Sequence, residues 1–196
     1  MQIRNIEKMH TRVDLLVSKW DNGLTYDIRL IDMGLTFIAM KEYVDRMRDP
    51  QALLGTDKDD LEPELTATAI RIVKANANFL LKVQGKRGQF CRTYDVISDK
   101  PTSKCNKSRP NFAGIFALLE AYKLTKDERY VEGARKTWNY VWDAYWDEPS
   151  GLFRSTLGLD TVIIHALDVT AQLRAYREML FATPIHMSKP FINKFS

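Results

Sequence analysis

The 196-residue sequence is poor in the residues that build metal sites, redox centres and membrane spans. Its three histidines, His10, His165 and His186, have no spaced histidine or cysteine partner of the kind that binds zinc. No glycine-rich phosphate loop occurs, and no apolar run approaches the ~18 residues that cross a bilayer. We therefore expect no metal, no cofactor and no membrane span.

A dense block of positive charge is also lacking. The formal net charge is +4 and the pI about 9.0, but lysine and arginine are spread along the chain. This argues against a nucleic-acid-binding arm. Ordinary solubility charge is the simpler explanation of the basic balance, and affinity for anionic ligands such as acidic polysaccharides is the alternative.

Only two cysteines are present, Cys91 and Cys105, and their spacing excludes a Cys-x-x-Cys motif. A disulfide between them would close a loop of about 15 residues, while two free thiols are the alternative. A bridge would predict a periplasmic or extracellular protein, and free thiols a cytoplasmic one. Residues 1–5 lack the apolar stretch of a secretion signal, which fits a cytoplasmic protein or a chain that has lost its signal.

Apolar side chains recur at helical spacing through most of the sequence, which predicts an all-α fold. Pro50 should end the second helix, Pro63 should be the first residue of the third, and Thr125 with Glu128 has the form of a capping box. The predicted helices span about 3–20, 27–48, 63–84, 111–123, 125–146 and 160–181. Residues 184–196 are expected to form an irregular tail.

Three helix ends repeat along the chain. Gly23, Gly88 and Gly151 each follow a predicted helix and are 65 and 63 residues apart. The spacing indicates helical hairpins, with units near 1–26, 27–95, 96–160 and 161–183 in one domain of residues 1–183. Because one hairpin cannot bury its apolar face alone, the units should stack into an open arc of about six helices, or a partial ring.

The residues of these hairpins resemble a known group. Residues 117–130 (ALLEAYKLTKDERY), followed by Tyr145-Trp146-Asp147 and Gly151-Leu152-Phe153, look like the α/α toroids, the six-hairpin superfamily of carbohydrate-active proteins. Residues 79–84 with Gly88 are similar to the same repeated helix end, and residues 21–29 faintly resemble pectate lyases of that architecture. The resemblance covers most of 20–180, although the chain is short for a complete ring. It implies a ligand site at the ring's mouth, near residues 21–29, 90–111 and 147–161.

Several acids near this implied mouth are candidates for acid and base catalysis. Asp27, Asp95 and Asp160 are such candidates, because paired carboxylates divide these roles when their pKa values differ. The simpler interpretation is that Asp27 and Asp160 cap helices or lie in a first turn. His165 and Asp168 share a polar stripe of the sixth helix, which suits a general base held by a carboxylate, or else a solvated face.

Arginine and aromatic residues supply the candidate substrate contacts. A guanidinium matches the carboxylate of a sugar acid, and aromatic rings stack on sugar faces. The candidates are Arg29, Arg92, Tyr94, Trp146 and Arg154. Surface charge and helix packing are the simpler explanations of the arginines and of the aromatic cluster around residues 138–146.

Two functions follow from these observations. The first is a carbohydrate-active protein that acts on a poly- or oligosaccharide, acidic ones included, by hydrolysis, elimination or epimerisation. The second is a non-catalytic helical-repeat scaffold or subunit that binds a glycan or a protein on its concave face. Because an open arc exposes apolar helix faces, we also expect self-association or docking onto a larger protein.

Overall fold

The protein is a layer of helices with short strands gathered at one end. The structure, a computed structural model, describes residues 18–19, 26–48, 63–95 and 97–158 and the single positions 173, 175, 177 and 179. The continuous helices of this part are α2 (Leu30–Arg48), α3 (Pro63–Val83), α4 (Ser108–Thr125) and α5 (Glu128–Tyr145). The strands are β1 (Ser18–Lys19), β2 (Tyr26–Arg29), β3 (Thr93–Asp95), β4 (Trp146–Asp147) and β5 (Leu152–Phe153). The all-α prediction is confirmed, and none of the described helices is long and apolar enough to span a membrane.

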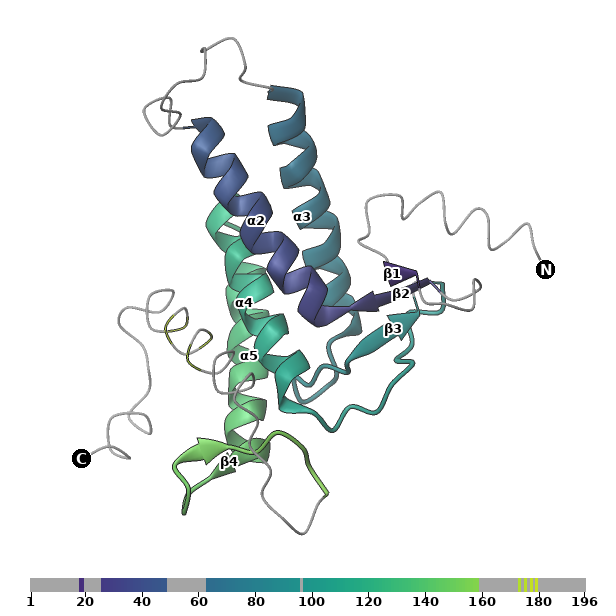
Figure 1. The fold of residues 1–196 in the computed structure, drawn as a ribbon, viewed down its shortest axis with the longest axis vertical. Coiled ribbons are helices and arrows are strands. Elements are labelled where there is room, and N and C mark those ends of the chain that lie inside the picture. The colour runs from purple at the N-terminus through teal and green to yellow at the C-terminus, as the bar shows by residue number, and fades with distance from the viewer. Residues whose placement is uncertain are drawn as a thin grey trace, which may run out of the picture.

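The helices alternate in direction, so the strands and the loops that precede α2 and α4 and follow α3 and α5 lie at one end of the layer. Helices α2 and α4 begin at this end, whereas α3 and α5 finish there (Figure 1). The strands form an antiparallel sheet in the order β1-β2-β3 and a separate β4-β5 hairpin. We call the strands together with residues 84–107 and 146–158 the loop end.

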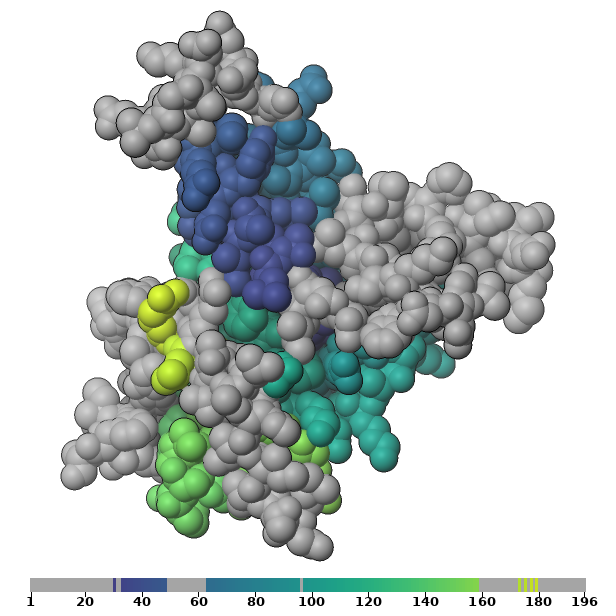
Figure 2. Space-filling model, in the orientation of Figure 1, coloured from purple at the N-terminus to yellow at the C-terminus, as the bar shows by residue number. Residues whose placement is uncertain are grey.

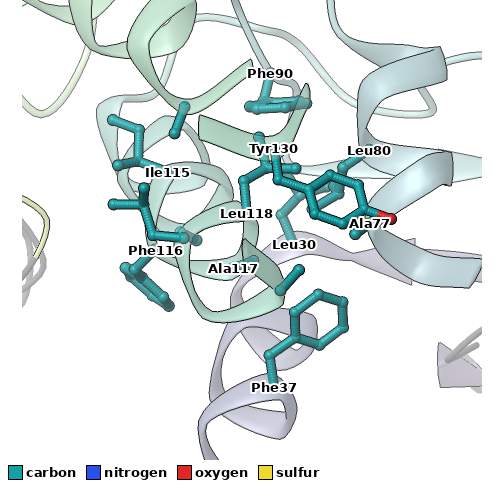
Figure 3. Packing of buried hydrophobic residues seen from close by; sticks show 14 of the residues in the cluster. Leu30, Phe37, Ala77, Leu80, Phe90, Ile115, Phe116, Ala117, Leu118 and Tyr130 are labelled. Carbon is teal, nitrogen blue, oxygen red and sulfur yellow. The ribbon is translucent and has the colours of Figure 1, made fainter. Parts of the chain in front are cut away.

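Helix α4 is the centre of the layer. Residues 110–121 of α4 are all buried, since α2, α3 and α5 each pack against it. Figure 3 shows Leu118 of α4 among side chains from the other three helices, with Tyr130 contributed by α5. In contrast, α5 alternates buried aromatic residues with exposed polar ones, as a helix covering one side of a core should.

Two glycines set how closely neighbouring elements approach. A Cβ added to Gly34 of α2 would lie 2.3 Å from Cε2 of Phe116 in α4. One added to Gly114 of α4 would lie 2.5 Å from the ring of Phe90. Because real Cβ atoms do not approach so closely, both positions require glycine for this packing.

The turn after α3 is tied to α5 by side-chain hydrogen bonds. Gln84 Nε2 donates to the Gly133 carbonyl at 2.8 Å and to Thr137 Oγ1 at 2.7 Å, and Thr137 Oγ1 donates to the Gly88 carbonyl at 2.8 Å. Gly88 has φ +98°, and the equivalent Gly151 after α5 has φ +65°. The third glycine of the predicted repeat, Gly23, lies outside the described residues.

Three predicted helix boundaries were wrong. Ser18 and Lys19 are a strand instead of the end of a helix, and α2 begins at Leu30 instead of Asp27 because β2 pairs with β1 and β3. Thr125 does not cap α5: it ends α4, where its hydroxyl donates to the Ala121 carbonyl at 2.7 Å.

The actual caps explain the remaining differences. Asp127 is the N-cap of α5, and its carboxylate accepts from the Arg129 N–H at 3.1 Å. Helix α4 begins at Ser108, three residues before the predicted start, because Pro110 fits in a first turn whose N–H groups have no intrahelical partners. The predicted start of α3 at Pro63 is confirmed.

Candidate functional site

The structure brings described parts of all three expected mouth segments together at the loop end. Asp27 and Arg29 of β2 pair with Asp95 and Thr93 of β3. On the other side, Lys107 forms a β-bridge with Thr156. The backbone N–H of Ser108 donates to the Ser155 carbonyl at 3.1 Å, and that of Leu157 to the Asn106 carbonyl at 2.9 Å. These pairings place the start of α2 beside β3 and the start of α4 beside the segment that follows β5, although the paired segments are far apart in sequence.

A disulfide closes the middle segment. Cys91 and Cys105 are bridged, so the structure selects this alternative over two free thiols. Inside the closed loop, the Thr102 N–H donates to the Thr93 carbonyl at 3.0 Å, and the Thr93 N–H donates to Ser103 Oγ at 3.0 Å. Residues 91–105 are therefore a compact, internally bonded loop with β3 as one edge.

Two of the candidate acids occupy opposite positions in the sheet. Asp27 lies across from Asp95, a register that places the two Cα atoms about 5 Å apart. The Asp95 carboxylate accepts from the N–H groups of Ile97 at 2.6 Å and Ser98 at 3.1 Å, which fixes the turn after β3. Because Asp27 belongs to a strand, the interpretation of it as a helix cap or first-turn acid was wrong.

Tyr94 lies in the core of the protein. Its ring is 2% exposed and packs edge-on against Phe79, with centroids 6.3 Å apart. Its hydroxyl accepts from the Cys91 N–H at 2.7 Å. Burial raises the pKa of this phenol to about 12. In this conformation Tyr94 fixes the backbone beside the disulfide and offers no ring face to a ligand.

The aromatic residues at the end of α5 form a cluster around Phe153 of β5. The rings of Trp142 and Trp146 stack with centroids 4.7 Å apart, and both contact the Phe153 ring edge-on. Trp138 is buried in the same cluster, whereas Trp142 and Trp146 stay half-buried. Packing therefore accounts for most of the aromatic cluster and leaves part of the Trp146 indole accessible.

The sequence interpretation missed the most organised carboxylate of the loop end, Asp147. Its Oδ1 accepts from Arg154 Nη2 at 2.7 Å and Nε at 3.2 Å, and its Oδ2 accepts from the Ser150 N–H at 3.2 Å. Asp147 is 5% exposed, and hydrogen bonds from Ser150 and then Arg154 hold the pKa of its carboxyl below the usual range. Such a carboxylate stays ionised and positions Arg154. The signal available in the sequence was an aspartate shortly after the aromatic end of α5, followed by Pro149-Ser150-Gly151 and Arg154.

Trp146 and Arg154 leave the β4-β5 hairpin in different directions. Trp146 pairs with Phe153, and the two rings touch, so they share one face of the hairpin. Because side chains alternate along a strand, Arg154 projects to the opposite face, where it meets Asp147. The two residues therefore do not contribute to one subsite through this hairpin.

The ion pair predicts a pH dependence of stability. Since the folded-state pKa of Asp147 is lowered, its stabilisation is fully present above the unfolded-state pKa, about 4, and is lost as the pH falls through the lowered value. We expect Asp147→Asn to melt at a lower temperature than the wild type at pH 7, with the gap closing on acidification. Thermal melts in small pH steps measure this. Asp143→Asn, at an exposed position of α5, is the matched control, and a constant gap for Asp147→Asn would contradict the role.

The other predicted site residues are less fully described. Arg92 is exposed, and its carbonyl accepts from the Leu30 N–H at the start of α2. For Asp27 and Arg29 the structure gives the backbone position only. Asp160, His165 and Asp168 lie outside the described residues, so their roles stay predictions.

The comparisons with known proteins support the fold. The chain is similar to a GH76 α-mannanase from Bacteroides thetaiotaomicron, with a TM-score of 0.55, 16% identity and coverage of 86% of this chain and 39% of that one. It is also similar to an unsaturated glucuronyl hydrolase specific for heparin, with a TM-score of 0.59, 15% identity and coverage of 96% and 49%. No family model matches the sequence, and no curated protein matches it.

These likenesses show the architecture of the chain. Both neighbours are α/α toroids, so the chain has the fold of part of such a toroid. It spans less than half the length of either neighbour. The loop end corresponds to the side where helices such as α2 and α4 begin, which is where the resemblance in the sequence placed the mouth of the ring.

Proposed function

We propose that this chain is a carbohydrate-active protein of α/α-toroid type that acts on a poly- or oligosaccharide by hydrolysis, elimination or epimerisation. The observation that carries the proposal is its structural likeness to two carbohydrate-active enzymes over most of its length. The proposal is also supported by the pairing, at the loop end, of described parts of the three segments expected at the mouth of the ring.

The proposed roles follow the chemistry of the candidate residues. Asp27, Asp160, His165 and Asp168 are the proposed acid and base groups. Trp146 is the proposed platform for a sugar ring, because its indole is half-buried and rigidly stacked. Arg154, oriented by Asp147, and the exposed Arg92 are proposed to bind anionic or hydroxyl groups of the glycan.

A non-catalytic glycan-binding scaffold is the second candidate, and one observation favours it. Three described carboxylates of the loop end already have structural partners. Asp95 fixes a turn, Asp99 pairs with Lys82, and Asp147 pairs with Arg154. Catalysis would then depend on carboxylates such as Asp27 and Asp160. The expected association with a second copy or a larger protein also stays a prediction.

The disulfide bears on where the protein works. Bridged cysteines persist in oxidising environments and are rare in the cytosol. We therefore propose a periplasmic or extracellular location, the alternative that the sequence tied to a Cys91–Cys105 bridge.

Turnover of a glycan panel tests the function. Neutral and acidic polysaccharides are incubated with the protein, and new reducing ends, unsaturated products and epimerised sugars are measured. If the proposal holds, at least one glycan is converted, and Asp27→Asn or Asp160→Asn lowers the rate about 100-fold or more because general acid–base catalysis is lost.

The control for these variants is Asp143→Asn, which changes an exposed carboxylate in the last turn of α5 to which the proposal gives no role. It should keep full turnover. Glycan binding without turnover of any panel member would favour the scaffold. Absence of both binding and turnover with every glycan would reject a carbohydrate function.

A further inference from the structure

The proposed function leaves unexplained a concentration of positive charge at the loop end. Residues 86–109 contain seven lysines and arginines against two aspartates, a formal charge of +5, whereas the whole chain carries +4. The rest of the chain is therefore slightly acidic. The cations are Lys86, Arg87, Arg92, Lys100, Lys104, Lys107 and Arg109. Apart from the adjacent Lys86 and Arg87, these cations are separated by other residues within this one segment.

Both aspartates of this segment have hydrogen-bond or ion-pair partners within the protein. The Asp95 carboxylate accepts from the N–H groups of Ile97 and Ser98. Asp99 pairs with Lys82 of α3 at 2.5 Å, so its charge is balanced by a cation outside the segment.

Four of the cations lie on or beside the disulfide-closed loop. Arg92 and Lys104 are the chain neighbours of Cys91 and Cys105, so the bridge brings their backbones together. Lys100 ends the turn that Asp95 fixes, and its carbonyl accepts from the Asp95 N–H at 2.9 Å. Lys107 precedes α4, and its Nζ donates to Thr156 Oγ1 at 2.7 Å.

These four side chains face solvent. All four residues are exposed, and Arg92, Lys100 and Lys104 have no carboxylate partner among the residues that the structure describes. The loop that carries them forms an exposed surface of the molecule beside β3 (Figure 2). Because the disulfide and the hydrogen bonds fix the backbone, the charges are held in place before any ligand binds, which lowers the entropic cost of binding.

We propose that Arg92, Lys100, Lys104 and Lys107 form a binding surface for an anionic polysaccharide that carries carboxylate or sulfate groups. The four residues stand at different positions along the loop. Several separate positive charges suit a polymer whose negative charges repeat along its length. A disulfide places the protein in an oxidising compartment, where an acidic glycan is a more suitable partner than a nucleic acid. This inference rests on the proposed carbohydrate function and narrows its substrate class.

The test compares two double variants with the same change in net charge. Lys100→Glu with Lys104→Glu reverses two exposed charges of the loop, and Lys74→Glu with Lys136→Glu reverses two exposed charges on α3 and α5. Binding of each to heparin, polygalacturonate, neutral mannan and duplex DNA is measured by calorimetry at several salt concentrations. Circular dichroism verifies that both variants fold.

We expect the wild type to bind heparin or polygalacturonate with an affinity that falls as salt rises, since ions screen exposed charges. The loop variant should bind at least tenfold more weakly, and the control variant within threefold of the wild type. The choice between heparin and polygalacturonate distinguishes sulfate from carboxylate as the recognised group.

Four outcomes would overturn the inference. Equal loss in both variants would mean that only net charge matters, and tighter binding of DNA than of either acidic glycan would assign the surface to nucleic acid. Binding or turnover of mannan without binding of the acidic glycans would reject the anionic surface and leave the proposed function standing. Failure with every glycan, acidic and neutral, would reject both.

Discussion

Replacing Gly88 by alanine is expected to destabilise the protein by about 2–4 kcal/mol, because the added methyl group meets two separate energetic costs. The first is the backbone, since φ at Gly88 is +98°, a conformation that a side chain disfavours. The second is space, since an added Cβ would lie 2.4 Å from the backbone carbonyl oxygen of Lys136, which cannot rotate away. Urea denaturation followed by circular dichroism measures the loss.

Gly151→Ala provides a matched control for this effect. Gly151 also has a positive φ, +65°, but nothing lies within 4 Å of its added Cβ. It should therefore cost only the conformational part, about 1 kcal/mol. Equal losses for the two variants would show that the contact between the turn after α3 and helix α5 does not restrict position 88.

Reduction of the disulfide is expected to lower the free energy of unfolding by about 3 kcal/mol, the value for a closed loop of about 15 residues. Cys91 and Cys105 are 14 positions apart, and the bridge holds the start of β3 against the return of its loop. Thermal melts with and without a reducing agent measure the effect, and alkylation followed by mass spectrometry verifies that both thiols have been freed.

The variant Cys91→Ala with Cys105→Ala separates this effect from other actions of the reducing agent. Its melting temperature should lie below that of the oxidised wild type and should not respond to reduction. An unchanged melting temperature in the wild type with both thiols alkylated would contradict a structural role for the bridge.

The sequence predicted the four continuous helices of the described residues well, because their apolar periodicity is a local property. The predicted ends near Arg48 and Gln84 agree with the structure to within one residue, and the start at Pro63 is the same. The strand Tyr26–Arg29 was missed because it exists through pairing with residues 93–95, which are distant in sequence. Thr125 was misread for a related reason, since a capping box and a helix end share the same residue types there.

The site was less predictable than the fold. The sequence did indicate which segments meet, since the resemblance pointed to segments that the structure brings together. That a ligand binds there stays a prediction. The role of each side chain depends on its burial and on its hydrogen-bond partners, and the spacing of residues in the sequence reveals neither. Tyr94 is buried beside the disulfide, and Asp147 holds Arg154. Likewise, the excess charge of residues 86–109 was not predicted, because most of its cations stand singly and form no continuous basic run.

The near-complete burial of α4 divides the molecule into parts that open at different rates. Its contacts with α2, α3 and α5 must break together before its backbone amides can meet solvent, so those amides exchange hydrogen only through global opening. The loop end contains short strands and turns, and it opens locally at lower cost. A polymer bound there would slow hydrogen exchange in the loops while leaving exchange in α4 unchanged, because the helical layer is already closed without it.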